Sequence, residues 1–416
     1  MSVLRNAAGL PHQVKKIEHF WITLKDGCRL AARLWLPEDA EQKPVPAILE
    51  YIPYRKRDGT RARDEPMHAY FAGHGYAAIR VDLRGSGESD DVLQDEYLQL
   101  ELDDAVEVID WIAAQKWCDG TIGMMGKSWG GFNCLQVAAM RPKQLKAVLS
   151  VCSTDDRYRD DIHYMGGCLL NDNQWWGDIM LAYQSRPADP ALFGPGWKDN
   201  WLKRIAGMPF WPALWMQHPT RDAYWKHGSI CEDYGAIQCP VYLVGGWADA
   251  YTNAIPRMLE HLKVPRKAMI GPWAHIYPHD GVPGPAIGFL QEAVKWWDRW
   301  LKGQENGIMD GPMLWAWLED SERPSTTSAY RQGRWVGAKT WPDTGAIAAE
   351  TWHLGQGVLG KSAQPAADLA ICSPQTIGAA CGEWMGAGCP GEGPADQRMD
   401  DAGSLVFDSE PLARDL

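Results

Sequence analysis

The segment Gly-Lys-Ser-Trp-Gly-Gly at residues 126–131 constrains the fold of this chain most strongly. It follows an apolar run at 122–125, which is typical of a buried strand, and precedes a predicted helix over 129–140. Such a strand-to-helix turn needs glycines two residues to either side of the strained serine, because a Cβ there would collide with the crossing strand or helix. The N–H groups at the helix start would stabilise an oxyanion beside the hydroxyl. Ser128 is therefore a candidate nucleophile, although a glycine turn with a solvent-facing serine explains the motif alone equally well.

Composition and charge narrow the class of protein. A chain of 416 residues with 45% apolar content can bury a large core, and its length predicts two domains or one elaborated α/β domain. The net charge of -12 and the lack of long basic runs argue against a nucleic-acid partner. We expect no membrane partner and a cytoplasmic protein, because no segment has the length of a membrane span and residues 1–6 lack the layout of an export signal. The cysteines form no C-x-x-C pair and are expected to be reduced and mostly buried.

The first third of the chain reads as strands followed by alternating helices and strands. A turn at 25–27 joins two alternating runs, 19–24 and 28–36, and predicts an antiparallel hairpin. The next strands are predicted from near-continuous apolar runs at 45–51, 76–81 and 147–151, as in a parallel sheet covered on both faces. Helices are predicted over 65–73 and 98–117. We assign residues 1–153 to the first part of an α/β core.

Strand signals stop after residue 153 and resume only at 239. Residues 154–238 carry prolines, short helical patterns and many tryptophans, and we interpret them as a helical cap over the active site. Most of these tryptophans are expected to form the core of the cap itself. We take Trp175, Trp176 and Tyr251 as the candidates for contact with substrate.

Two further strand and helix units complete the predicted core over 239–310. They consist of strands at 240–247 and 267–271, a helix at 254–262 and a long amphipathic helix at 286–302. Residues 311–416 become β-like, with strands predicted at 313–318, 350–354 and 404–407. These few strands cannot bury the core of a β-sandwich by themselves. The segment therefore either packs against the main domain or belongs to a separate domain that is truncated.

A catalytic serine needs a histidine base that is held by a carboxylate, and in one class of α/β sheet these residues follow in the order Ser, Asp, His. Asp249 comes just after the strand at 240–247, and His275 just after the strand at 267–271. Carboxyl ends of parallel strands build the site in such sheets. His275 is preferred to His279 because it lies nearer the strand end. An ordinary loop aspartate and loop histidine are the alternative, which the joint placement of Ser128, Asp249 and His275 makes the weaker one.

An oxyanion hole needs two donors. One is the backbone N–H of Trp129, next to the nucleophile, and the other is expected from the loop that follows the strand at 45–51. In that loop Tyr54 can donate its hydroxyl. Taken alone, Tyr54 would more often be a packed surface aromatic, so this assignment depends on the resemblance that follows.

The chain resembles the bacterial cocaine esterase and X-prolyl dipeptidyl-peptidase family of α/β-hydrolases. The blocks that carry the resemblance lie, in the family's order, at 29–37, 53–56, 82–89, 126–131 and the pair 246–251 with 271–275. The resemblance implies an α/β-hydrolase fold with a mostly parallel sheet and a helical cap. It also implies that Ser128, Asp249 and His275 form the triad and that Tyr54 donates to the oxyanion. Asp82 and Arg84, in the block at 82–89, are expected to hold loops near the site.

Two departures from the family pattern matter. Many relatives have tyrosine after the nucleophile, whereas this chain has Trp129, which keeps the backbone donor but changes the pocket wall. Members of the family also carry a C-terminal jelly-roll domain, of which residues 311–416 would hold only the start. We therefore expect a truncated chain in which one wall of the pocket is missing.

The sequence predicts a serine hydrolase that cleaves ester or amide bonds of small acyl substrates and needs no metal or organic cofactor. Its expected partner is a small ester or a short peptide, and a homodimer is one option for its assembly. An X-prolyl dipeptidyl-peptidase is the alternative, and it would need a carboxylate in the cap to hold the substrate's amino group. The sequence leaves four aspartates open for this role: Asp155, Asp156, Asp160 and Asp161. An acyltransferase and a non-catalytic binding protein with this fold are further alternatives.

Overall fold

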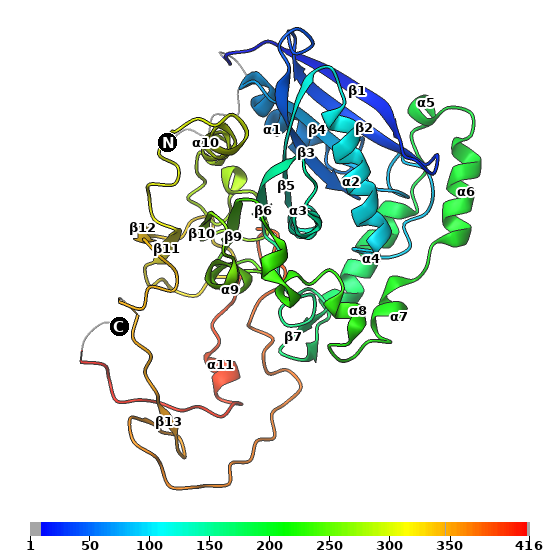
Figure 1. Ribbon diagram of the computed structural model, residues 1–416. Helices are drawn as coiled ribbons and strands as arrows, with labels where there is room; N and C mark the ends of the chain where they lie inside the picture. The colour runs from blue at the N-terminus through cyan, green and yellow to red at the C-terminus, as the bar shows by residue number, and fades with distance from the viewer. Residues whose placement is uncertain (1–9, 346, 414–416) are drawn as a thin grey trace.

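A computed structural model describes residues 10–345 and 347–413 of the chain. Its centre is a twisted sheet with the strand order β1-β2-β4-β3-β5-β6-β9-β10-β11-β12 (Figure 1). The strands are β1 (Val14–Thr23), β2 (Arg29–Pro37), β3 (Val45–Ile52), β4 (Ala77–Asp82), β5 (Cys118–Lys127), β6 (Leu145–Val151), β9 (Val241–Gly246), β10 (Arg266–Gly271), β11 (Leu314–Glu319) and β12 (Gly333–Ala338). Residues 1–9, on which the expected lack of an export signal rests, lie outside the described part.

The sheet is parallel from β4 to β11 and antiparallel at its two edges. Strand β2 joins β1 and β4 in antiparallel register, which confirms the predicted hairpin, and β12 pairs with β11 in the same way. The side chains of β4 are buried along the whole strand. Burial on both faces explains why the central strands read as continuous apolar runs rather than as alternating ones.

Helices cover both faces of this sheet. On one face α1 (Arg61–Gly73) contacts α10 (Phe289–Leu301), and on the other α2 (Gln99–Ala113) contacts α3 (Trp129–Met140) (Figure 1). Helix α9 (Ala254–His261) packs on β9 and β10, and a short 3-10 turn, η3 (Pro278–Asp280), precedes α10. Helix α10 buries the stripe predicted from its sequence, including Phe289 and Trp297, and it buries Trp296 as well. The carboxyl ends of the parallel strands are thereby left to carry the site.

Residues 154–238 form short helices that lie together at the right of Figure 1. They are α4 (Asp172–Gln184), α5 (Pro190–Phe193), α6 (Trp197–Gly207), α7 (Trp211–Trp215) and α8 (Ala223–Lys226), followed by the 3-10 turns η1 (Ile230–Glu232) and η2 (Tyr234–Ala236). A two-stranded hairpin of β7 (Tyr164–Met165) and β8 (Cys168–Leu169), which the sequence analysis missed, precedes them. Trp211, Trp215 and Trp225 are buried in this region, whereas Trp175 is 46% exposed.

Two strands of the segment predicted to be β-rich, residues 311–416, lie in the central sheet. Strand β11 lies parallel to β10 and, with β12, continues the central sheet past residue 311. Helix α10 packs back across the sheet, so the strand that follows it reaches the open edge of β10. The division of the remaining residues into domains stays a prediction.

The chain after β12 contains little regular structure and loops away from the sheet (Figure 1). It holds β13 (His353–Leu354), paired with β14 (Leu359–Gly360), and the short helix α11 (Arg398–Asp401). The strand predicted at 350–354 is thus reduced to two residues, and residues 404–407 form no strand. The segment returns to the core at residues 384–386, where Trp384 Nε1 donates to the Asp161 carbonyl at 3.1 Å.

None of the helices in the described part of the chain combines the length and the apolarity that a membrane crossing needs.

Candidate active site

Ser128 lies in a sharp turn between β5 and α3. Its backbone has φ +60° and ψ -125°, a conformation that residues with a side chain rarely adopt. Its N–H donates to the Val151 carbonyl at 2.9 Å, which ties the turn to the end of β6. A Cβ on Gly126 would lie 2.5 Å from the Gly130 Cα, and one on Gly130 would lie 2.8 Å from Ile52 Cγ2. Both glycines are therefore required by close packing within the turn.

Asp249 and His275 meet across the loops that follow β9 and β10. The Nδ1–H of His275 donates to Asp249 Oδ1 at 2.8 Å, and the Asp249 side chain is fully buried. This hydrogen bond fixes the tautomer of the imidazole and leaves the lone pair on Nε2 available to accept a proton. We refer to these two residues as the Asp249–His275 pair.

The backbone of His275 is held from two sides. Its N–H donates to the Gly386 carbonyl at 2.8 Å, and its carbonyl accepts from Lys127 Nζ at 2.8 Å. Burial lowers the pKa of His275, and the positive charge of Lys127 lowers it further, whereas Asp249 raises it. The net effect is a pKa below the usual value, so the ring is neutral near pH 7 and can act as a base.

Ser128 and His275 line the same small pocket, of about 50 Å³. The three residues predicted to contact substrate, Trp175, Trp176 and Tyr251, line it too. The pocket also contains residues that the sequence analysis did not single out: Glu96, Tyr97, Ile162 and Met385. These four carry no motif, and they come from loops whose position depends on contacts far along the chain.

Tyr54 reaches the same place from the loop after β3. Its hydroxyl lies within hydrogen-bonding reach of the Ser128 side chain and of the Trp129 backbone N–H. Burial raises the pKa of Tyr54 above its usual value, so the hydroxyl keeps its proton at neutral pH. The loop is anchored by the Lys56 N–H, which donates to Asp82 Oδ1 at 2.9 Å. The Tyr54 hydroxyl and the Trp129 N–H thus converge on one point beside the serine.

Asp82 and Arg84 hold loops, as the sequence analysis expects. Asp82 receives the Lys56 N–H and also pairs with Arg80 at 3.2 Å. Arg84 forms two hydrogen bonds with the carboxylate of Asp104, at 2.8 and 2.9 Å. Both partners of each contact are buried, so these charges are paired inside the protein rather than exposed to a substrate.

The Trp129 side chain forms part of the pocket's support. The indole is fully buried, and its Nε1–H donates to Glu101 Oε1 at 2.7 Å. The Tyr54 ring packs edge-on against this indole, with ring centroids 6.4 Å apart. Tryptophan in this position therefore gains a buried acceptor on α2, which fixes the first turn of α3.

Asp161 is the one of the four aspartates considered above that lines the pocket. Its Oδ1 accepts the Tyr251 hydroxyl at 3.0 Å, and burial raises its pKa to about 7. Asp155 and Asp160 pair instead with Arg257, and Asp156 pairs with Arg221. These three carboxylates are therefore used within the protein.

Glu96 is a second carboxylate in the pocket wall. It accepts from Arg157 Nη2 at 3.0 Å and from His163 Nε2 at 2.8 Å. Burial opposes the ionisation of Glu96, but His163 and Arg157 together hold its pKa at about 2. Glu96 is thus ionised near neutral pH, with Arg157 and His163 as its hydrogen-bond partners.

A buried cluster of Glu50, Asp64 and His68 has the donor atoms of a cation site. Arg63 pairs with Glu50 at 2.7 Å, and Arg80 lies 3.4 Å from Asp64. These guanidinium groups supply the positive charge that the carboxylates need. We interpret the cluster as an ion-pair network under β3 and β4.

Comparison with known proteins identifies the family to which this chain belongs. The family model of the X-Pro dipeptidyl-peptidase (S15 family) matches residues 26–277, which include Ser128, Asp249 and His275. The chain belongs to the S15 family. Among curated relatives of this chain, cocaine esterase from Rhodococcus sp. is 27% identical over 355 residues, covering 74% of this chain and 60% of that protein. The chain thus spans about 60% of the length of that relative.

Solved structures support the fold of this S15 member. A CocE/NonD family hydrolase from Staphylococcus aureus has a TM-score of 0.67 at 18% identity, covering 83% of this chain and 60% of that one. An α-amino acid ester hydrolase has a TM-score of 0.64 at 19% identity, covering 88% of this chain and 65% of that one. The predicted α/β-hydrolase fold with a mostly parallel sheet is confirmed.

Proposed function

We propose that this chain hydrolyses ester or amide bonds of small acyl substrates through an acyl-enzyme formed on Ser128. One observation carries the proposal: the Asp249–His275 pair is hydrogen bonded at 2.8 Å, and His275 lines the same pocket as Ser128. Nucleophile, base and orienting carboxylate are the minimum set for this chemistry. The relatives' names, cocaine esterase and X-Pro dipeptidyl-peptidase, agree with this reaction class.

In the first step the Ser128 oxygen attacks the substrate carbonyl carbon while His275 Nε2 takes the hydroxyl proton. The imidazolium that forms is stabilised by the buried carboxylate of Asp249. The depressed pKa of His275 keeps the ring neutral before the attack. The same proton is then given to the leaving alcohol or amine, and the bond between it and the acyl carbon breaks.

The negative charge on the carbonyl oxygen would be stabilised by two donors. They are the Tyr54 hydroxyl and the Trp129 N–H, which converge beside Ser128. The pocket is largely buried, so these hydrogen bonds act in a low dielectric and need little reorganisation during the reaction. Water activated by His275 then attacks the acyl carbon, and Ser128 is released as a free hydroxyl with the acid as product.

The test is the Ser128→Ala variant, assayed on aryl esters and with a fluorophosphonate that labels activated serines. We expect turnover to fall by roughly four orders of magnitude or more, with no labelling, because the residual rate comes from binding and the oxyanion donors alone. Ser153→Ala is the matched control, since Ser153 is buried nearby but does not line the pocket. Turnover or labelling that survives in Ser128→Ala would contradict the proposal.

A second candidate function is cleavage of substrates with a free α-amino group. It is favoured by Asp161, a carboxylate that lines the pocket with Ser128, whereas Glu96, which also lines it, already pairs with Arg157 and His163. A substrate ammonium group beside the ionised Asp161 would be paired with buried negative charge. Turnover of a dipeptide-proline chromogenic amide, measured beside aryl esters of acids with and without an α-amino group, separates the two functions. Equal rates on the two kinds of ester would leave simple ester hydrolysis as the function.

A further inference from the structure

Cys152 lies against the Asp249–His275 pair. Its Sγ, one Asp249 carboxylate oxygen and one His275 ring nitrogen all lie within 4.8 Å of one another. Cys152 follows the last residue of β6, and its N–H donates to the Val244 carbonyl on β9 at 2.8 Å. Its φ of +49° turns the chain sharply at this point. The backbone therefore holds a thiol against the loop that carries Asp249.

These three side chains form a donor set for a soft or borderline divalent cation. Thiolate, imidazole and carboxylate are the ligands that Zn²⁺ takes, whereas Mg²⁺ and Ca²⁺ require oxygen ligands. With bond lengths of about 2.0 to 2.3 Å, two ligands of a tetrahedral zinc ion lie roughly 3 to 4 Å apart. The three donor atoms lie within 4.8 Å of one another, so their separations must shorten by up to about 1 Å when an ion binds.

His275 uses only one of the two oxygens of the Asp249 carboxylate. Oδ1 accepts the His275 hydrogen bond, while Oδ2 is buried and has no N–H or O–H donor among the described residues. The buried Lys127 ammonium is engaged by the His275 carbonyl instead. The Cys152 thiol, a weak donor, lies within hydrogen-bonding reach of this carboxylate, so a bound cation would replace a weak partner with a full charge.

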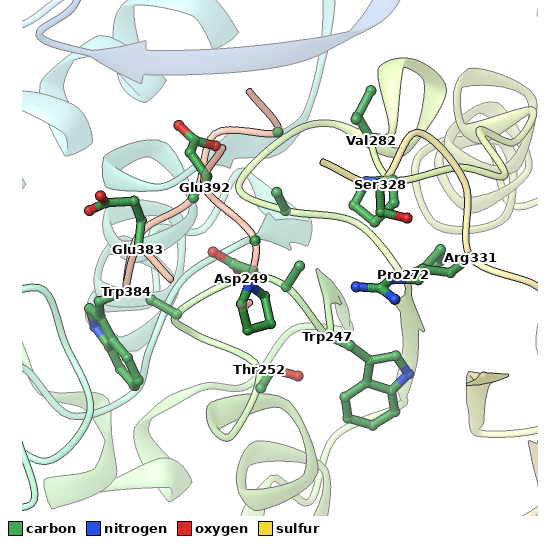
Figure 2. Close-up of a pocket in the computed structure, with 18 of the residues that line it drawn as sticks. Trp247, Asp249, Thr252, Pro272, Val282, Ser328, Arg331, Glu383, Trp384 and Glu392 are labelled. Carbon is green, nitrogen blue, oxygen red and sulfur yellow. The ribbon is translucent and has the colours of Figure 1, made fainter. Parts of the chain in front are cut away.

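A second cavity lies next to the cation site. This cavity, of about 430 Å³, is lined by Asp249 (Figure 2), whereas the serine pocket is lined by His275. Its wall carries Glu319, Glu383 and Glu392 against a single arginine among its lining residues, Arg331. The excess of carboxylates attracts cations. This cavity therefore attracts cations to the residue that carries the buried carboxylate.

We propose that Cys152, Asp249 and His275 form a binding site for a thiophilic divalent cation of the Zn²⁺ or Cd²⁺ class. When the ion binds, the thiol proton goes to solvent, and Nδ1 of His275 becomes a ligand while its proton moves to Nε2. The ion's charge is balanced by one thiolate and one carboxylate. The nitrogen that would take the serine's proton is then already protonated, so occupancy switches hydrolysis off. The binding claim stands by itself, and only the inhibition rests on the proposed function.

The test uses Cd²⁺ as the probe, because a cadmium–thiolate bond has its own ultraviolet absorption. The exposed cysteines would bind the probe as well, so the background protein carries serine at the four exposed positions: Cys168, Cys372, Cys381 and Cys389. Cys152→Ser is compared with Cys134→Ser in this background. Cys134 is a matched control, since it is equally buried but lies on α3 and donates to the Gly131 carbonyl. Calorimetry, thiolate absorption and ester turnover are measured on each protein.

We expect the background protein and Cys134→Ser to bind one Cd²⁺ with thiolate absorption and to lose turnover in parallel. Cys152→Ser should lose the absorption and require at least roughly tenfold more Cd²⁺ for the same fractional inhibition. Losing a metal ligand should lower the affinity at least as much as losing a residue that hydrogen bonds to a ligand. No thiolate absorption in the background protein at saturating Cd²⁺ would overturn the site, and this result needs no folded variant. Equal inhibition of both variants would overturn it too. If the background protein lacks ester turnover, the proposed hydrolysis fails, while calorimetry and absorption still decide the site.

Discussion

The Tyr54→Phe variant isolates one hydroxyl in the proposed oxyanion hole. The Tyr54 ring packs against Trp129, Trp176 and Tyr183, with centroids 5.8 to 6.4 Å apart. Phenylalanine keeps this ring and its packing and removes only the oxygen. Because burial raises the pKa of Tyr54, the hydroxyl is protonated and able to donate throughout the usual assay range. The substitution therefore removes a donor without changing the charge of the site.

The expected loss follows from the position of this hydroxyl. Removing one donor from an oxyanion hole lowers kcat by roughly 100- to 1,000-fold, or about 2.7 to 4 kcal/mol. Tyr54 is only 9% exposed, so water does not readily replace the missing group, and we expect a loss in the upper half of this range. KM should change little, because the charge that the hydroxyl stabilises exists only in the transition state. The free energy of unfolding should change by about 1 kcal/mol, the usual worth of one hydrogen bond.

Steady-state kinetics on an aryl ester and thermal unfolding of the same samples give the two quantities. Tyr183→Phe is the control, since its ring packs against that of Tyr54, whereas the hydrogen bonds to Ser128 and Trp129 are those of Tyr54. A Tyr54→Phe enzyme with kcat within about threefold of the parent would refute the role of the hydroxyl, because such a change is under 1 kcal/mol. A large loss accompanied by an unfolded protein would instead assign Tyr54 to the core.

Two further predictions concern the turn and the pocket wall. Gly126→Ala should destabilise the chain by about 1 to 3 kcal/mol through overpacking and abolish turnover. Gly196→Ala is the control and should leave stability and turnover unchanged, because its Cβ would lie 3.6 Å from the nearest atom. A Gly126→Ala protein that is stable in thermal unfolding and active in kinetics would contradict this prediction. For an ester with an α-amino group, kcat/KM relative to the matched ester without it should rise between about pH 6 and pH 7.5, because Asp161, whose pKa is about 7, gains its charge there while the substrate amine is still protonated. Asp161→Asn should flatten this ratio, and an unchanged pH profile in that variant would argue against contact between Asp161 and the amino group.

The elements around the serine could be predicted because their signals are local. Helix α3 has the predicted bounds, Trp129–Met140, since the glycine turn starts it and Arg141-Pro142 ends it. The predicted hairpin of β1 and β2 likewise follows from alternation and a tight turn. The order of Ser128, Asp249 and His275 after three strand ends needed only the carboxyl-end rule for parallel sheets.

Other features depend on contacts between distant segments. Composition predicts that residues 313–318 form a strand, but not that this strand pairs with β10. Of four neighbouring aspartates, Asp161 lines the pocket because arginines from elsewhere pair with the other three. Met385 lies in a glycine-rich stretch without periodicity, so no local pattern indicates that it reaches the serine pocket. Such long-range pairings are not encoded in any short window of the sequence.

The return of residues 384–386 to the core separates the shape of the pocket from the stability of the sheet. Met385 contributes a side chain to the pocket and Gly386 supplies an acceptor for His275, yet the segment that carries them pairs with no strand of the central sheet. We expect exchanges of the buried side chain at position 385 to alter the size of the acyl group that the proposed hydrolase accepts. Residues 384–386 therefore offer a place to redesign the pocket without altering the strands of the central sheet.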